Sequence, residues 1–182
     1  PGNGDGTFKK DVILEAGKNG AFLATADFDS DGDLDLFVGG RCRPGRYPSP
    51  VASVILRNDS GQFVKDDKHA ALLSKAGSVS AAVWTDLLGD HHPELVLACD
   101  PGLIRVYRNI GGSLREVTAE LGLEDRVGFW NSIAAGDVDL DGDIDLVAGN
   151  FGLNTKYHAS EEHPALLYAG NFGTAKTKLI EA

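Results

Sequence analysis

One aspartate-rich segment occurs twice in the chain and limits the structures that the chain can adopt. The segment covers residues 27–35 and again residues 137–145. Both copies have aspartate at positions 1, 3, 5, 7 and 9 with glycine at position 6. An apolar run ends each copy, over residues 34–38 and 144–148. A glycine-containing turn beside short apolar runs is typical of a β-hairpin. The two copies therefore predict two similar hairpins in one repeating structure.

A third, altered copy lies between these two. It keeps an acidic residue at positions 1, 5 and 9 as Asp86, Asp90 and Glu94, whereas Leu88 stands at position 3 and His91 replaces the glycine. The three copies follow one another at intervals of about 50 to 60 residues, which is long enough for a unit of four strands with one or two long loops.

The rest of the unit also recurs. Residues 54–64 and 104–114 each contain an apolar run, a turn with asparagine and glycine, and a second short run, which predicts a hairpin. Residues 3–8 look like the end of such a hairpin from a preceding unit. Residues 165–182 fit either the hairpin that completes the third unit or a fourth aspartate turn altered at Asn171. Their short distance from the preceding aspartate turn favours the first of these.

These repeats predict an all-β chain that forms part of a β-propeller of four-stranded antiparallel blades, with about three blades in this chain. The expected blades are residues 20–68, 79–119 and 131–182, after the end of a preceding blade at residues 1–19. Single helical turns are expected at residues 70–73 and 117–123. The chain contains no methionine, and three blades leave two open edges, so we expect it to be part of a longer protein.

The side chains of the two complete turns suit a calcium ion. Calcium prefers six to eight hard oxygen ligands, and glycine at position 6 allows the sharp bend that brings alternate side chains together. We expect the carboxylates of positions 1, 3, 5 and 9 and the backbone carbonyl of position 7 as ligands. The expected ligand residues are Asp27, Asp29, Asp31, Asp33 and Asp35 in the first turn and Asp137, Asp139, Asp141, Asp143 and Asp145 in the other.

The alternative is a solvated acidic turn without an ion. Four carboxylates about 6 Å apart form six pairs, and each pair is repulsive by roughly 0.7 kcal/mol even in water. A divalent cation would remove this repulsion, which is roughly 4 kcal/mol before screening. The sequence therefore favours Ca2+ as the cofactor.

An EF-hand is the other aspartate-rich calcium loop to consider. It needs a glutamate at position 12 and two flanking helices. Position 12 is Val38 in the first copy and Ala148 in the second, and both lie in apolar runs that predict strands. The EF-hand is therefore excluded, and a shorter loop that closes a β-hairpin is expected.

The altered middle turn is a weaker metal site. Asp86, Asp90 and Glu94 remain as candidate ligands, but the carboxylate at position 3 is lost. Histidine adopts positive φ more readily than most residues, so the turn could persist at His91 without an ion. A transition-metal pair formed by His91 and His92 is a further alternative to two exposed histidines beside a proline turn.

The motif Asp-x-Asp-x-Asp-Gly-x-x-Asp, followed by a short apolar strand and glycine, resembles the FG-GAP/VCBS repeat. The stretches 41–48, 84–86 and 128–133 are similar to bacterial relatives of the cartilage acidic protein family. The resemblance implies a β-propeller of about seven blades, as in the head domains of integrin α-subunits. It also implies a structural role for calcium, a function in adhesion or ligand binding, and a secreted, cell-surface or periplasmic location.

Loop positions predict where a ligand would bind. In antiparallel blades the aspartate turns share one end of the strands, so the long loops 40–50 and 150–164 and the connection 120–131 share the opposite end. Arginine and aromatic side chains there suit acidic sugars or a protein partner. Alternatively, the arginines brace loops and the tryptophan packs between blades. The candidate rim residues are Arg41, Arg43, Arg46, Tyr47, Trp130, Asn154, Lys156 and Tyr157.

Composition and cysteine content narrow the possible partners. The net charge of −10 argues against nucleic acid or an anionic membrane surface. The chain has no run of about 18 apolar residues, so we expect no insertion into a membrane. Cys42 and Cys99 could form one disulfide or could be two small buried residues.

Catalytic motifs are missing from the sequence. It contains no nucleophile elbow, P-loop, His-Glu-x-x-His or Cys-x-x-Cys. We therefore expect a calcium-stabilised extracellular binding or adhesion module and not an enzyme. The alternatives are the propeller portion of a carbohydrate-active enzyme, such as a polysaccharide lyase or hydrolase, and a spacer that binds nothing.

Overall fold

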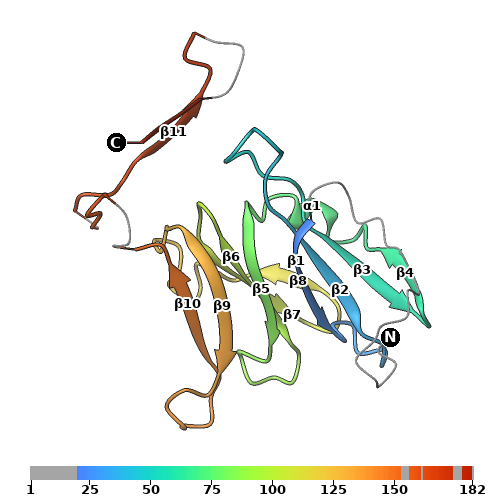
Figure 1. The fold of residues 1–182 in the computed structure, drawn as a ribbon. Helices are drawn as coiled ribbons and strands as arrows, with labels where there is room; N and C mark the ends of the chain where they lie inside the picture. The colour runs from blue at the N-terminus through green and yellow to red at the C-terminus, as the bar shows by residue number, and fades with distance from the viewer. Residues whose placement is uncertain (1–19, 153–155, 161, 174–177, 182) are drawn as a thin grey trace, which may run out of the picture.

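The regular secondary structure of the described residues is almost entirely antiparallel β-sheet (Figure 1). The computed structural model describes residues 20–152, 156–160, 162–173 and 178–181. The first sheet has the order β1-β2-β3-β4, and the second has the order β5-β6-β7-β8. Their strands are β1 (Gly20–Ala26), β2 (Asp35–Gly40), β3 (Val54–Asp59), β4 (Gln62–Lys65), β5 (Val79–Thr85), β6 (Glu94–Cys99), β7 (Ile104–Asn109) and β8 (Leu114–Glu116).

Two smaller sheets follow along the chain. One pairs β9 (Trp130–Gly136) with β10 (Asp145–Asn150), and the other pairs β11 (Leu167–Gly170) with β12 (Lys178–Glu181). The prediction of an all-β fold built from four-stranded antiparallel sheets is confirmed. The expected preceding blade, residues 1–19, lies outside the described residues.

Helical structure is confined to one turn in the part of the chain that the structure describes. The helix α1 (Ala70–Leu73) lies between the first two sheets, as the sequence predicts. Residues 117–123 form hydrogen-bonded turns and not the second helical turn that we expected. Since α1 is so short, no described helix could cross a membrane.

The sheets stand side by side in the manner of neighbouring propeller blades. The first strand of each sheet contacts the first strand of the next, so that β1 lies beside β5 and β5 beside β9 (Figure 1). This arrangement places the three aspartate turns, which follow β1, β5 and β9, at one end of the strands. No closure into a ring occurs among the described strands.

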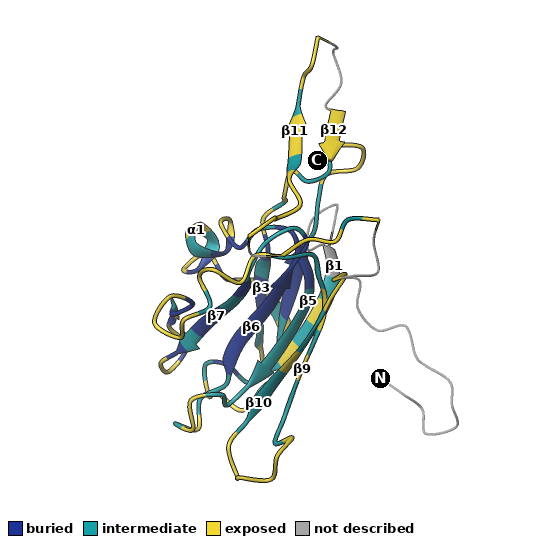
Figure 2. Ribbon diagram, turned by 90° about the vertical axis from the view of Figure 1, so that its left-hand side faces the viewer, coloured by how far each residue is buried: buried dark blue, intermediate teal, exposed yellow. Residues whose placement is uncertain are grey.

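The hydrophobic core fills the spaces between adjacent sheets. The strand β6 is buried along its whole length, and its side chains alternate between two clusters, as strand geometry requires. Leu95, Leu97 and Cys99 pack toward the first sheet, whereas Val96 and Ala98 pack toward the third. The second sheet is therefore covered on both faces, and Figure 2 shows it as the most deeply buried part of the protein.

The third sheet is less complete than expected. We predicted one four-stranded blade over residues 131–182, but β10 pairs only with β9 among the described strands, and β11–β12 forms a separate sheet. Figure 1 shows that hairpin extending away from the other sheets. Val147 on β10 is 56% exposed, which is consistent with an open end to the array of sheets.

The hairpin β11–β12 resembles the aspartate hairpins in its register. Gly170 pairs with Lys178, just as Ala26 pairs with Asp35 in the first hairpin. The segment between the paired residues is long, whereas the β3–β4 turn between Asp59 and its partner Gln62 is short. This register is the one that the alternative interpretation of residues 165–182, a hairpin of the aspartate-turn type, predicts.

The two cysteines are free thiols. Cys99 is buried in the first core cluster, and its Sγ donates a hydrogen bond to the carbonyl of Ala76 at 3.2 Å. Burial raises the pKa of this thiol to about 11. The sequence left open a disulfide or two small buried residues. Cys99 is a small buried residue of the core.

A buried asparagine connects the first two sheets. Asn109 at the end of β7 is fully buried, and its Nδ2 donates to the carbonyl of Phe28, which lies in the first aspartate turn, at 2.7 Å. Its Oδ1 accepts a hydrogen bond from the amide of Gly112 at 3.0 Å. This side chain therefore joins the end of the second sheet to the turn of the first.

Replacing Asn109 with alanine should destabilise the protein substantially. Asn109→Ala leaves a buried carbonyl without its donor, and the expected loss is about 1–3 kcal/mol in the free energy of unfolding, measured with urea. Asn58 occupies the equivalent place in the first sheet and is only half-buried, so Asn58→Ala is the matched control and should cost less. Equal losses in the two variants would contradict the role of Asn109 as the connection between sheets.

Candidate metal centre

Three aspartate turns connect β1 to β2, β5 to β6 and β9 to β10, and all three share one backbone conformation. Positions 4 and 6 have positive φ in every copy. The residues and their φ angles are Ser30 at 63° and Gly32 at 95°, Gly89 at 68° and His91 at 64°, and Leu140 at 65° and Gly142 at 98°. The middle turn therefore persists with histidine in place of glycine, as the sequence analysis allowed.

The carboxylate at position 9 organises the first turn. Asp35 begins β2 and is almost fully buried. Its Oδ2 accepts a hydrogen bond from the amide of Phe28 at 3.2 Å, and its Oδ1 accepts one from the amide of Asn58 at 2.8 Å. One side chain thus joins the turn, β2 and β3. Burial raises the pKa of Asp35, against the lowering effect of these two hydrogen bonds.

The same position has the same role in the other turns. Glu94 is fully buried; its Oε2 accepts hydrogen bonds from the amides of Leu87 and Leu88, and its Oε1 accepts one from Asn109 at 3.4 Å. Burial also raises the pKa of Glu94. In the third turn, Oδ2 of Asp145 accepts from the amide at position 2 at 2.9 Å.

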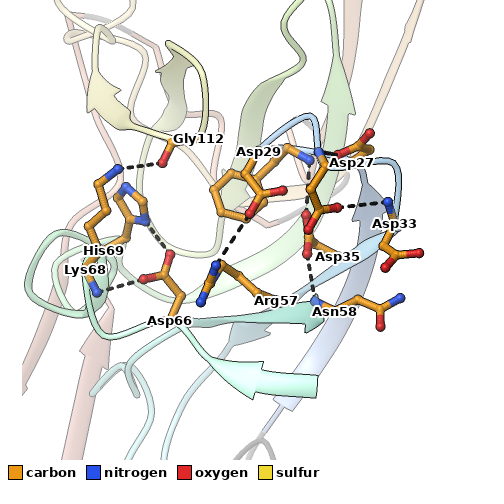
Figure 3. A network of polar contacts seen from close by, with 12 residues as sticks. Asp27, Asp29, Asp33, Asp35, Arg57, Asn58, Asp66, Lys68, His69 and Gly112 are labelled. Carbon is orange, nitrogen blue, oxygen red and sulfur yellow. Dashed lines mark hydrogen bonds and ion pairs between the residues drawn. The ribbon is translucent and has the colours of Figure 1, made fainter. Parts of the chain in front are cut away.

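The first turn gathers three carboxylates. Asp27, Asp29 and Asp35 each place an oxygen within 4.8 Å of the others (Figure 3). The two oxygens of Asp27 accept hydrogen bonds from the amides of Asp31 and Gly32, both at 3.0 Å. These bonds hold the position 1 carboxylate over the turn.

One oxygen in this cluster is buried without a partner. Asp29 Oδ1 has no hydrogen bond within the described structure. The other oxygen of Asp29 lies 3.7 Å from Nη1 of Arg57, a distance that permits an ion pair but no hydrogen bond (Figure 3). A buried acceptor without a donor is costly, and a cation in the cluster would satisfy it.

The third turn repeats this arrangement. Asp137, Asp139 and Asp145 also place oxygens within 4.8 Å of one another. The amide of Gly142 donates to Asp137 Oδ2 at 3.1 Å, whereas Asp137 Oδ1 is buried and has no hydrogen-bond partner in the described residues. Both complete turns thus hold three carboxylates and one buried, unsatisfied oxygen.

The remaining predicted ligands have other contacts. At position 5, Oδ1 of Asp31 and of Asp141 accepts a hydrogen bond from the amide two residues later, at 2.9 Å in both turns. Asp33 Oδ2 accepts from the amide of Ser60 at 3.0 Å, which joins the turn to the β3–β4 hairpin. Asp143 is exposed. The structure therefore brings together positions 1, 3 and 9, while the position 5 carboxylate lies outside both clusters.

The middle turn gathers its acidic residues at positions 1, 5 and 9. Asp86, Asp90 and Glu94 have oxygens within 4.8 Å of one another. His91 is almost fully exposed, and its Nδ1 lies 3.6 Å from Asp86 Oδ2. The three acidic clusters among the described residues that could hold a metal ion contain neither His91 nor His92.

A cavity of about 510 Å³ lies at the other end of the strands, between the loops after β2, β6 and β10 and the hairpin β11–β12. It is lined largely by aromatic and apolar side chains, with two basic and two acidic residues. The lining residues are Arg41, Asp100, Phe129, Asn131, Phe151, Lys156, Tyr157, Ala165, Leu166, Leu167 and Glu181.

The charged residues of this cavity are already paired. Asp100 accepts a hydrogen bond from Nη2 of Arg41 at 2.8 Å and another from the hydroxyl of Tyr47 at 3.0 Å. Burial, together with Asp100, raises the pKa of Tyr47 well above its usual range. The Tyr157 hydroxyl donates to Glu181 at 2.6 Å, and Nζ of Lys156 lies 3.8 Å from the same carboxylate.

The predicted rim is brought together only in part. Arg41, Lys156 and Tyr157 line the cavity, and Tyr47 reaches it through Asp100. Arg43 and Arg46 are exposed in the loop after β2 and do not line the cavity. Asn154 lies outside the described residues.

Trp130 has a packing role. Its ring packs against the core cluster between the second and third sheets, and its Nε1 donates to the carbonyl of Arg126 at 3.0 Å. This placement matches the alternative in which the tryptophan packs between blades.

Sequence reasoning missed several cavity residues. Phe129 and Phe151 line the cavity. They lie in the connection 120–131 and the loop 150–164, from which we had chosen other residues for the binding rim. Asp100 directly follows β6, just as Arg41 directly follows β2, so the strand repeat could have placed these two at the same end. No local pattern indicates Glu181. It lines the cavity because the whole β11–β12 hairpin lies beside it, and a short segment of sequence does not determine that placement.

One comparison with known families finds a match. Residues 86–148 match the FG-GAP-like repeat family. This stretch begins at position 1 of the middle aspartate turn and ends inside β10, so it covers one complete interval between turns and the third turn itself. The matched stretch is therefore similar to an FG-GAP-like repeat, which is consistent with a β-propeller-type module. A comparison with curated proteins finds no match.

Position 4 of the third turn offers a test of the turn conformation. Leu140 is 85% exposed at a φ of 65°, a conformation that costs a residue with a Cβ about 1 kcal/mol or more. Leu140→Gly should therefore raise the melting temperature by about 2–4 °C. Val138→Gly, at an exposed residue of the same turn without positive φ, is the control and should not raise it. A fall in melting temperature for Leu140→Gly would contradict the shared turn conformation.

Proposed function

We propose that this chain is part of a calcium-stabilised β-propeller that binds a ligand outside the cytoplasm. The single observation that carries the calcium part is the pair of buried oxygens, Asp29 Oδ1 and Asp137 Oδ1, that lack hydrogen-bond donors within the described residues. Each belongs to a cluster of three carboxylates. A cation bound to each cluster satisfies the oxygen and offsets the repulsion among the acids.

The donor set favours calcium over other metals. Both clusters offer carboxylate oxygens and contain no histidine or cysteine, and hard oxygen ligands suit calcium or magnesium better than zinc or copper. Calcium accepts irregular sets of six to eight oxygens, whereas magnesium demands a near-ideal octahedron. Carboxylates on a flexible turn, with carbonyl and water oxygens to complete the shell, fit the calcium geometry better.

The proposed role of calcium is to stabilise the folded turn. An ion that binds the native turn and not the unfolded chain stabilises folding by RT ln(1 + [Ca2+]/Kd). With a Kd of about 0.1 mM and calcium at about ten times this value, each site contributes about 1.4 kcal/mol. Sites of this affinity fill outside the cytoplasm and stay empty at low cytosolic calcium, which supports a secreted, cell-surface or periplasmic location.

The calcium proposal predicts a shift in melting temperature. The protein should melt at a higher temperature in 1 mM calcium than in chelator, by about 6 to 11 °C if both sites fill. The double variant Asp29→Asn with Asp139→Asn removes one carboxylate charge from each cluster and should abolish most of the shift. Differential scanning calorimetry in the two buffers measures both quantities.

A matched control separates the clusters from general charge effects. Asp59 is exposed and belongs to neither cluster, so Asp59→Asn should keep the full calcium shift. If the wild-type protein melts at the same temperature with calcium and with chelator, the proposed stabilisation by calcium is wrong.

The cavity at the opposite end supports the binding part of the proposal. A volume of about 510 Å³ is within the range of small-ligand sites. Phe129, Phe151 and Tyr157 supply aromatic surface, which packs against the apolar faces of sugar rings. Arg41 and Lys156 carry more N–H donors than their contacts with Asp100 and Glu181 use, so they can also bind an acidic group. An acidic oligosaccharide is therefore the ligand class that we propose.

The pairing of the acidic groups favours binding over catalysis. Both oxygens of Asp100 accept hydrogen bonds, and Glu181 is held by Tyr157 and Lys156. An enzyme that cleaves polysaccharides by acid–base catalysis needs a carboxyl group positioned for proton transfer. The two carboxylates in this cavity are instead engaged with neighbouring side chains.

The binding proposal predicts recognition of sugars without turnover. On an array of neutral and uronate-containing oligosaccharides, the protein should bind acidic members, and Phe151→Ala should weaken binding by about tenfold or more. Leu23→Ala, which changes an exposed apolar residue on β1, is the control. Depolymerised polysaccharide would instead support the enzyme alternative, and no binding at all would support a spacer.

A further inference from the structure

The middle turn differs from the two complete turns in how its carboxylate oxygens are satisfied. All six oxygens of its cluster have protein partners. Asp86 accepts hydrogen bonds from the amides of Asp90 and His91, both at 3.0 Å, and Glu94 accepts from three amides, at 3.0, 3.1 and 3.4 Å. Oδ1 of Asp90 accepts from the amide of His92 at 3.2 Å. The unsatisfied oxygen that supports a metal in the other turns therefore has no counterpart here.

The last oxygen of the cluster is satisfied by an arginine. Nη2 of Arg108, on β7, donates to Oδ2 of Asp90 at 2.8 Å. Both side chains are partly buried, with exposed fractions of 38% and 28%. The guanidinium hydrogen bond lowers the pKa of Asp90. A permanent positive charge is thus fixed against the cluster that would otherwise attract a cation.

The first sheet has an arginine at the equivalent place, which provides an internal comparison. Arg57 precedes Asn58, whose amide binds Asp35, and Arg108 precedes Asn109, whose amide binds Glu94. Nη1 of Arg57 lies 3.7 Å from Oδ2 of Asp29, beyond hydrogen-bond distance. Oδ1 of Asp29 is buried and has no hydrogen-bond partner within the described residues.

The loss of the position 3 carboxylate accompanies the different arrangement of the middle turn. Position 3 is Asp29 in the first turn and Leu88 in the middle turn. Without a carboxylate at position 3, the position 5 residue Asp90 joins the middle cluster and meets Arg108, whereas Asp31 at position 5 of the first turn lies outside its cluster. The loss of one carboxylate and the contact with arginine therefore belong to one rearrangement.

We propose that Arg108 replaces the metal ion in the middle turn, so that this turn is held by an internal positive charge and binds no calcium. The residues do not fit the ion, since each of the six oxygens already has a protein partner and the guanidinium supplies the compensating charge. The contrast with the other turns rests on the proposed function. The middle blade would then keep its turn when calcium is removed.

The variant Arg108→Gln tests the charge directly in chelator, where calcium makes no contribution. It should lower the melting temperature by about 2–4 °C, which corresponds to about 1 kcal/mol for a chain of this size. Arg57→Gln is the matched control and should lower it less, because Arg57 makes no hydrogen bond to its turn. Arg108→Lys keeps the charge and should recover part of the loss, which distinguishes charge from packing.

Calcium binding gives the second readout. Isothermal titration of the double variant Asp29→Asn with Asp139→Asn, which keeps the middle turn intact, should show no calcium binding in the millimolar range. One remaining equivalent of bound calcium, lost on Asp90→Asn, would overturn the proposal. So would an Arg108→Gln melting temperature in chelator equal to that of the wild type.

The two proposals fail in different ways. If the wild-type protein shows no calcium-dependent melting shift, the complete turns are not calcium sites. The comparison of Arg108→Gln with Arg57→Gln in chelator would still decide whether Arg108 stabilises the middle turn.

Discussion

The structure depends on one repeated interaction, the hydrogen bonding of the carboxylate at position 9 of each aspartate turn. In the first turn Asp35 accepts a hydrogen bond from an amide of its own turn and another from an amide of β3. In the middle turn Glu94 likewise accepts hydrogen bonds from its own turn and from β7. This side chain therefore fixes the turn, the second strand and the third strand of a blade together. Its burial raises the pKa of both groups, so the acidic turn would be costly without compensating charge nearby. In the middle turn Arg108 on β7 supplies that compensation, and for the complete turns we propose a cation.

Two forms of compensation follow from the same backbone. The complete turns hold three carboxylates and leave a buried oxygen for a cation, whereas the middle turn satisfies its oxygens with amides and Arg108. Positive φ at positions 4 and 6 is common to both forms, with His91 adopting the conformation of glycine. The backbone conformation of the turn therefore does not depend on which acidic residues form its cluster. On the proposed function, the middle turn keeps this conformation while a side chain takes the place of the ion.

The features that short segments determine could be predicted from the sequence. The all-β fold, the hairpins, the helical turn at residues 70–73 and the carboxylates of positions 1, 3 and 9 follow from spacing within a few residues. The position 5 carboxylates stay a prediction as ligands, because the clusters of the two complete turns contain only positions 1, 3 and 9. The cavity could be anticipated only in part, since Arg41 meets Asp100 from a distant part of the chain. The separate β11–β12 sheet could not be foreseen from a local pattern, because both interpretations of residues 165–182 predict a hairpin.

The most direct test of the central claim is the number of calcium ions that the wild-type chain binds. Isothermal titration calorimetry, with the chain first treated with chelator and then dialysed, measures this number and the affinity together. The account predicts two equivalents, one at the cluster of Asp27, Asp29 and Asp35 and one at the cluster of Asp137, Asp139 and Asp145. An absence of bound calcium at millimolar concentration would contradict the account.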